Sequence, residues 1–184
     1  MRIIAGEARG RMIEAPAGLR TRPTLDRVRE NLFNMIQNDV PGSRVLDLFA
    51  GSGALSLEAI SRGASFAVLA DIDRNAYEVQ KKNITTLHYE NKTRQLRCDW
   101  RSAVRTLLNE NERFDLVFLD PPYEMTDLRE VFSMMMLMIG PESIIVLEHE
   151  AGKDPLVSEK YQVIKDRAWG FCAVTMYRLM PEGV

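Results

Sequence analysis

Cysteine, histidine and long apolar stretches are scarce in this chain of 184 residues, which contains two cysteines and two histidines. Cys98 and Cys172 lie far apart and outside any metal-ligand spacing, as in a reduced, intracellular protein without a metal site. The longest apolar run, residues 134–139, is far shorter than the roughly 20 residues that span a bilayer. The first residues also lack the pattern of a signal peptide. We therefore expect a cytoplasmic protein with no membrane segment.

Charge is unevenly distributed along the chain. The net charge is −2, but residues 1–29 hold seven arginines against three acidic residues, so this segment carries +4 and the remainder −6. Arginine is suited to bidentate phosphate contacts and to stacking on bases. The segment is either a nucleic-acid-binding arm or a solvated basic arm without a partner. The candidate RNA-binding residues are Arg9, Arg11, Arg20 and Arg22.

The rest of the sequence alternates between apolar strands and helices, which predicts an α/β fold with a parallel sheet covered on both faces. A hydrophobic content of 46% is enough for one sizeable core, so we expect a single domain over 1–184, with an N-terminal arm and helix in 1–40 and a core in 44–184. Strands are expected at 44–49, 66–71, 93–98, 114–119 and 143–148, helices at 53–62, 74–86, 101–110 and 126–138, and a terminal antiparallel hairpin from 161–166 and 171–179.

The first expected strand of the core ends at Asp47 and leads through Phe49 into Gly51-Ser52-Gly53 and a helix. Glycines at such a turn let a ligand approach backbone N–H groups that a Cβ would cover. A dinucleotide site needs a small residue where Ser56 stands, and an acid beside a diphosphate is unfavourable; a P-loop lacks its Gly-Lys-Ser/Thr here. The turn suits a ligand with an amino acid tail and a sulfonium, such as S-adenosylmethionine, whose ammonium group Asp47 would meet directly or through water.

Further acids follow the next two strands. Asp71 is placed to accept hydrogen bonds from both ribose hydroxyls of an adenosine ligand, with Asp73 as the alternative. Asp99 is a candidate for the adenine amino group, with Trp100 or Cys98 lining the ring. The competing role of any one of these acids is a helix N-cap. The expected cofactor-binding set is Asp47, Phe49, Gly51, Gly53, Asp71, Ile72, Asp99, Trp100 and Asp120.

The fourth strand of the core ends in Asp120-Pro121-Pro122-Tyr123. The prolines fix the backbone and remove N–H donors, so carbonyl oxygens point outward. An exocyclic amine of a nucleobase can donate one hydrogen to Asp120 and the other to the Pro121 carbonyl, while Tyr123 stacks on the base. This grip aims the nitrogen lone pair at a methyl donor and leaves Asp120 to accept the proton. The competing interpretation is an ordinary proline-rich turn.

On these residues the chain resembles the bacterial RsmD-like 16S rRNA guanine-N2 methyltransferases, which are class I S-adenosylmethionine-dependent enzymes. The similarity runs along most of the chain and is densest at residues 2–6, 9–11, 22–34, 47–63 and 120–123. The resemblance implies a Rossmann-like, mostly parallel seven-stranded sheet of order 3-2-1-4-5-7-6 with strand 7 antiparallel. It also implies that Asp71 is the ribose acid and Asp120 the catalytic acceptor.

The function expected from the resemblance is methyl transfer to the N2 amine of a guanine in 16S rRNA or an assembling small ribosomal subunit. We also expect the protein to be a monomer. The motif at 120–123 is shared with adenine-N6 methyltransferases, so an adenine enzyme acting on DNA or RNA remains an alternative. A non-catalytic RNA-binding assembly factor is another.

Overall fold

The structure is a computed structural model that describes residues 1–15, 23–122, 124–153 and 159–181, and the side chains of 23–25 are also not described. The candidates Arg20, Arg22 and Tyr123 lie outside the described residues.

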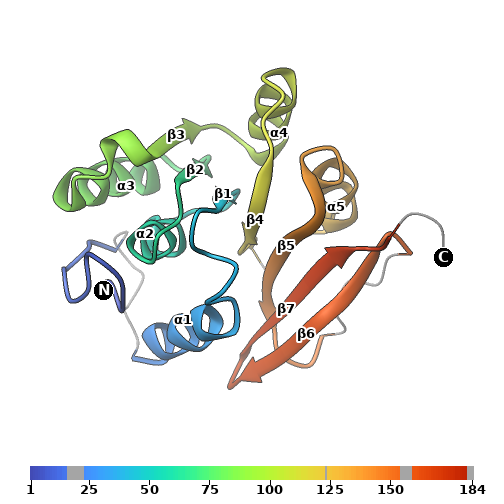
Figure 1. Ribbon diagram of the computed structural model, residues 1–184, viewed down its shortest axis with the longest axis horizontal. Helices are drawn as coiled ribbons and strands as arrows, with labels where there is room; N and C mark the ends of the chain where they lie inside the picture. Colours follow the sequence, from blue (N-terminus) through green and yellow to red (C-terminus); the bar gives the residue numbers. More distant parts are fainter. Residues whose placement is uncertain (16–22, 123, 154–158, 182–184) are drawn as a thin grey trace.

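A seven-stranded sheet of order β3-β2-β1-β4-β5-β7-β6 organises the molecule (Figure 1). Every neighbouring pair from β3 to β5 is parallel, whereas β7 runs antiparallel to both β5 and β6. The expected order and the terminal hairpin are therefore confirmed. The strands are β1 (Arg44–Asp47), β2 (Phe66–Asp71), β3 (Thr93–Arg97), β4 (Phe114–Leu119), β5 (Ile139–Glu150), β6 (Tyr161–Trp169) and β7 (Cys172–Leu179).

Strand β5 begins earlier than the apolar run at 143–148 predicts. Ile139 already pairs with Phe114 of β4, and the register then shifts before Leu116 pairs with Ile144. The Ser143 hydroxyl bridges this irregularity, because it accepts the N–H of Gly140 at 3.0 Å and donates to the Phe114 carbonyl at 2.8 Å. A side-chain bridge of this kind cannot be inferred from hydrophobic periodicity.

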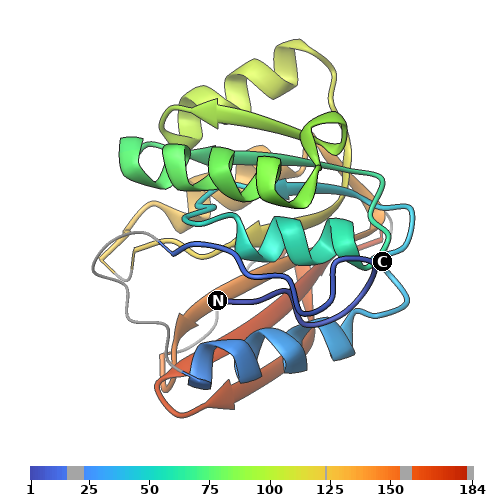
Figure 2. The ribbon, with the colours of Figure 1, turned by 90° about the vertical axis from the view of Figure 1, so that its left-hand side faces the viewer.

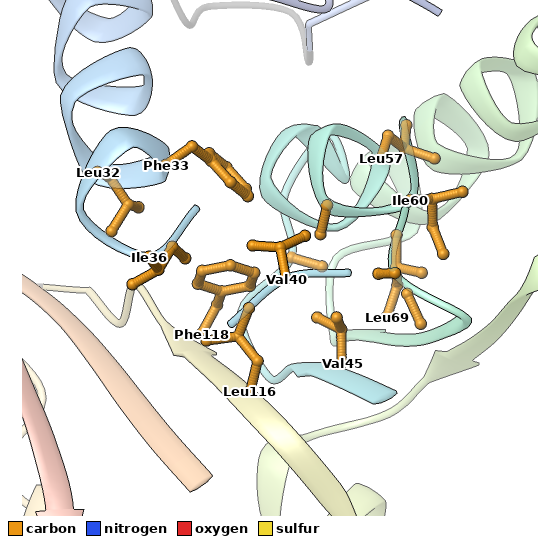
Figure 3. Packing of buried hydrophobic residues seen from close by; sticks show 14 of the residues in the cluster. Leu32, Phe33, Ile36, Val40, Val45, Leu57, Ile60, Leu69, Leu116 and Phe118 are labelled. Atoms are coloured by element: carbon orange, nitrogen blue, oxygen red, sulfur yellow. The ribbon is translucent and has the colours of Figure 1, made fainter. Parts of the chain in front are cut away.

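Helices cover both faces of the sheet (Figure 1). One face packs against α1 (Pro23–Met35), α2 (Ala54–Ser61) and α3 (Arg74–Leu87), and the other against α4 (Trp100–Asn109) and α5 (Leu128–Met135); η1 (Glu90–Lys92) is a short 3-10 turn. On the first face Phe33 of α1 meets Phe118 of β4, with ring centroids 5.8 Å apart (Figure 3). No helix in the described ranges has the length and apolar character to cross a membrane.

The N-terminal arm, residues 1–15, folds back on itself through one antiparallel bridge between Arg2 and Met12. It lies along α2 (Figure 2) and buries Ile3, Ala8 and Ile13 in the core. The fold therefore includes the arm as a packed element.

Backbone groups of the arm are held by two side chains of α2. Glu58 accepts the N–H groups of Ile4 and Ala5 at 2.8 and 3.0 Å, and the Ser61 hydroxyl accepts that of Ala8 at 3.0 Å. Satisfying buried N–H groups in this way avoids a cost of about 1–3 kcal/mol for each group. The arm is thus tied to the helix that follows the glycine turn.

Glu58 is fully buried, so its charge needs compensation. Arg62, at the end of α2, lies 2.7 Å from one of its oxygens and Arg29 of α1 lies 3.9 Å from the other. Arg29 also donates to the Arg2 carbonyl at 2.6 Å and to Asp26 at 3.0 Å. This network joins the arm, α1 and α2 around one carboxylate.

Gly6 and Gly10 of the arm offer a matched test of this docking, since both have φ +82°. A Cβ on Gly6 would lie 1.8 Å from the Ser61 carbonyl oxygen, whereas a Cβ on Gly10 meets nothing within 4 Å. Both Ala variants carry the left-handed backbone cost of about 1–2 kcal/mol. We expect Gly6→Ala alone to displace the arm, giving a clearly lower melting temperature and faster hydrogen exchange at the Ile4 and Ala5 amides. Equal effects of the two variants would contradict the docking.

Candidate active site

Acidic residues gather where the parallel strands end. Asp47 ends β1 and Asp71 ends β2, while Asp99 and Asp120 follow β3 and β4. Because β3, β2, β1 and β4 are parallel neighbours, their carboxyl ends share one edge of the sheet. Ligands of open α/β sheets bind beyond this edge.

The two glycines of the turn after β1 are needed for different structural reasons. Both adopt positive φ, +52° at Gly51 and +80° at Gly53. A Cβ at Gly53 would lie 2.8 Å from the Leu69 side chain, so this glycine permits the close packing of the turn on β2. A Cβ at Gly51 would meet nothing within 4 Å, so the backbone at Gly51 faces open space. That space is where a ligand can approach.

Side chains of β2 and α3 hydrogen-bond to the backbone of the glycine turn. Asp71 accepts the Gly51 N–H at 2.8 Å, and the Gln80 amide donates to the Gly51 carbonyl at 3.0 Å. Asn83 donates to the Ser52 carbonyl at 3.0 Å. These bonds fix the orientation of the peptide groups that form the expected cofactor site.

Gln80 and Asn83 were not found by sequence reasoning, although a signal was present. Both are fully buried and share a helical stripe with Ala76, Ile84 and Leu87. Polar side chains at apolar positions of an amphipathic helix need buried partners, and here the partners are carbonyls of the turn.

Asp47 is the most buried acid of the site, with 1% of its surface exposed. One carboxylate oxygen accepts from the Ser56 hydroxyl at 2.9 Å, and the other, Oδ1, has no hydrogen-bond partner among the described residues. Burial raises the pKa of Asp47 to about 7, and the Asp71 charge adds to the rise. A buried, unpartnered acceptor beside an open glycine turn fits the ammonium group of an amino acid tail.

Asp71 and Asp73 have separate roles in the structure. Asp71 accepts the Gly51 N–H through one oxygen and the Asp73 N–H, at 2.9 Å, through the other. Asp73 caps α3 by accepting the Ala76 N–H at 2.8 Å. Between them Ile72 keeps 72% of its surface exposed, which leaves an apolar side chain free to contact a ligand.

Asp99 serves as the N-cap of α4, the competing role for an acid at a strand end. It accepts the N–H groups of Arg101 and Ser102 at 3.0 and 3.1 Å, and the Ser102 hydroxyl at 2.6 Å. Hydrogen bonds from Ser102 lower the pKa of Asp99. Its contact with adenine stays a prediction.

Trp100 packs in the core, with 8% of its surface exposed. Phe49 is half-buried against the same apolar cluster. The contacts of both rings with a cofactor stay predictions.

Asp120 is exposed directly beyond β4, next to the buried Pro121. The Pro122 carbonyl accepts the Met125 N–H at 2.9 Å, which turns the chain back toward α5. Protein atoms crowded around the Asp120 carboxyl raise its pKa well above the usual value, and the charges of Glu148 and Asp47 contribute. The carboxylate expected to hold the amine is therefore placed at the same edge as the glycine turn.

Glu148 of β5 is a further acid at this edge, with no role assigned from the sequence. Leu119 pairs with Leu147 in the parallel β4–β5 ladder, so Asp120 and Glu148 are the next residues in register. Burial raises the pKa of Glu148.

The described arginines of the arm differ in their engagement. Arg11 donates to the Thr86 and Leu87 carbonyls at the end of α3. Arg9 is exposed and borders a hollow of about 520 Å³ between the arm and α1. Arg2 and Arg27 also line the hollow. Within the described residues, no three His, Cys, Asp or Glu side chains are placed to hold a metal ion.

The sheet order, with its reversed β7, and the glycine turn beyond β1 are those of a class I S-adenosylmethionine-dependent methyltransferase. A solved structure described as a SAM-dependent methyltransferase from Agrobacterium tumefaciens matches with a TM-score of 0.65 over 86% of this chain and 63% of that chain. Its sequence is 16% identical, so this likeness concerns the fold alone.

The chain belongs to the family described as "Conserved hypothetical protein 95", whose model matches residues 1–178. It is 34% identical to the Ribosomal RNA small subunit methyltransferase D of Escherichia coli K12, covering 100% of this chain and 92% of that protein. A solved hypothetical protein of Thermus thermophilus is 31% identical, with a TM-score of 0.79 over 96% of this chain and 98% of that chain. The expected family and fold are confirmed.

The raised pKa of Asp47 predicts a pH dependence of ligand binding. The carboxyl is half protonated at a pH of about 7, and its protonated form cannot pair with an ammonium group. The affinity for S-adenosylhomocysteine should therefore be full above about pH 8 and decline as the pH falls to about 5.5. The decline should approach tenfold per pH unit below the pKa. Calorimetric titration across this pH range measures it. Asp47→Asn should bind more weakly with a flat profile, and an equally sloped profile in that variant would contradict the assignment.

Proposed function

We propose that this chain transfers a methyl group from S-adenosylmethionine to the exocyclic N2 amine of a guanine in small-subunit rRNA. The main support for this proposal is that Asp120-Pro121 lies at the same edge of the sheet as the glycine turn. Similarity over the full length to a protein named for methylating small-subunit ribosomal RNA supports the substrate class. Such a substrate implies action in the cytoplasm, on naked rRNA or on an assembling subunit.

The residues of the chain fit the cofactor. Gly51 leaves room for a ligand against its backbone, and the unpartnered Oδ1 of Asp47 suits an ammonium group. We assign the ribose hydroxyls to Asp71 and an apolar contact to Ile72. When bound, S-adenosylmethionine supplies an electrophilic methyl group on its sulfonium.

The reacting groups of the chain act by positioning and by accepting a proton. Asp120 accepts one hydrogen of the amine and the Pro121 carbonyl accepts the other, which holds the nitrogen lone pair toward the methyl donor. An aromatic amine is a weak nucleophile because its lone pair is delocalised, so this alignment supplies much of the rate. Asp120 then takes the proton that the nitrogen loses. Tyr123, outside the described residues, is assigned to base stacking.

The direct test is methylation of small-subunit RNA from a strain that lacks this protein, followed by nucleoside analysis. Wild type should produce N2-methylguanosine, while Asp120→Asn should lower kcat by at least about 100-fold, because an amide cannot accept the proton. S-adenosylhomocysteine binding and the melting temperature of the variant serve as controls for folding. N6-methyladenosine as the product would establish the adenine alternative, and no labelled product with any RNA or DNA would refute the catalytic proposal.

We further propose that exposed arginines beside the hollow contact RNA phosphates. Arg9 and Arg27 are exposed there, whereas the guanidinium of Arg11 is engaged by carbonyls of α3. Replacing Arg9 and Arg27 together with Ala should reduce the slope of log affinity against log salt concentration by about 0.7 for each lost contact. Arg11→Ala is the matched control and should leave the slope unchanged while lowering the melting temperature. An unchanged slope in the double variant would contradict the phosphate contacts.

A further inference from the structure

We infer that Glu148 determines the base specificity of the reaction, by accepting the N1–H of the target guanine while Asp120 holds its N2 amine. This inference rests on the proposed function.

The sheet places the two carboxylates side by side. Leu119 and Leu147 are partners in the parallel β4–β5 ladder, and Asp120 and Glu148 directly follow them. Side chains alternate between the faces of a strand, so partners in register share a face, and neighbouring strands lie about 4.8 Å apart. Phe118 and Val146 lie two positions before Asp120 and Glu148, and both pack in the core on the α1 side of the sheet. Asp120 and Glu148 therefore share this face. One edge of a purine can span both carboxylates at this spacing.

Glu148 also has a neighbour on its other side. Strand β7 runs beside β5, where Cys172 pairs with Glu150, and two residues along a strand lie on the same face, so Cys172 lies diagonally beside Glu148. Its thiol donates to the Ala173 carbonyl at 3.9 Å. Burial and the Glu148 charge raise the pKa of this thiol, so it stays protonated and keeps its S–H. Glu148 is half-buried between Cys172 and Asp120 and has no ion pair among the described residues. Its carboxylate needs a further hydrogen-bond donor.

Guanine offers donors that match this arrangement. Its Watson–Crick edge presents the N1–H directly beside the N2 amine, so two adjacent carboxylates each receive a hydrogen. Adenine presents an N1 acceptor beside its N6 amine and would set a lone pair against the Glu148 carboxylate. A site built to accept a hydrogen bond rejects an analogue that lacks the donor, because its own buried polar group is then unpaired.

The test uses RNA in which the target guanosine is replaced by 2,6-diaminopurine riboside. This base keeps the N2 amine but carries an acceptor at N1. Wild type should favour guanosine by about tenfold or more in kcat/KM, as expected for one hydrogen-bonded readout contact. Glu148→Gln has nearly the same shape and offers an amide donor to N1, so it should shrink or invert this preference. Glu148→Asp keeps an acceptor and should retain the preference at lower activity.

Glu150→Gln is the matched control, since Glu150 lies two residues further along β5, is exposed and pairs with Lys153. The ratio of its kcat/KM for guanosine to that for 2,6-diaminopurine riboside should equal the ratio for wild type. Wild type that methylates both bases equally, or a Glu148→Gln enzyme with an unchanged ratio, would overturn the inference while guanosine methylation still supports the proposed function. Absence of methylation by wild type on every RNA would instead refute the proposed function itself.

Discussion

The parallel register of β1, β4 and β5 is the constraint on which the site depends. It brings Asp47, Asp120 and Glu148 to one edge of the sheet. Burial raises the pKa values of Asp47 and Glu148, and protein atoms crowded around the carboxyl of the otherwise exposed Asp120 raise its pKa as well; neighbouring negative charges add to the rise at Asp47 and Asp120. Such a grouping is unfavourable in the free protein. A ligand with an ammonium group and a base with adjacent N–H donors would reduce the repulsion among these carboxylates. The unfavourable electrostatic energy of the free site would therefore favour binding.

The surroundings of the site show how a precise edge is maintained. Gln80 and Asn83 hold carbonyls of the glycine turn, and Glu58 holds backbone N–H groups of the arm. Each of these buried polar side chains has a partner of opposite hydrogen-bonding character, which is the condition under which burial is tolerated. Helix α2 is central, because it begins at the turn and carries Glu58 further along. The cofactor side and the arm are therefore parts of one packed unit.

Several expectations concerned residues with two competing roles. Asp99 was a candidate for adenine and for a helix cap, and the structure shows it capping α4. Trp100 was a candidate for lining the adenine ring and is packed in the core. Arg11 was a candidate for RNA and binds carbonyls at the end of α3. A strand-end acid, an aromatic ring or an arginine has the same local pattern in either role, since the partner comes from a distant segment.

Local patterns in the sequence were enough to predict the α/β class, the number and order of the strands along the chain, the position of the glycine turn and the acids at strand ends, because periodicity and turn chemistry are local properties of the chain. The tertiary structure decided which of those acids cap helices, and it placed Glu148 beside Asp120. It also revealed the docking of the arm on Glu58. Register and burial depend on segments far apart in the chain, so no local pattern contains them.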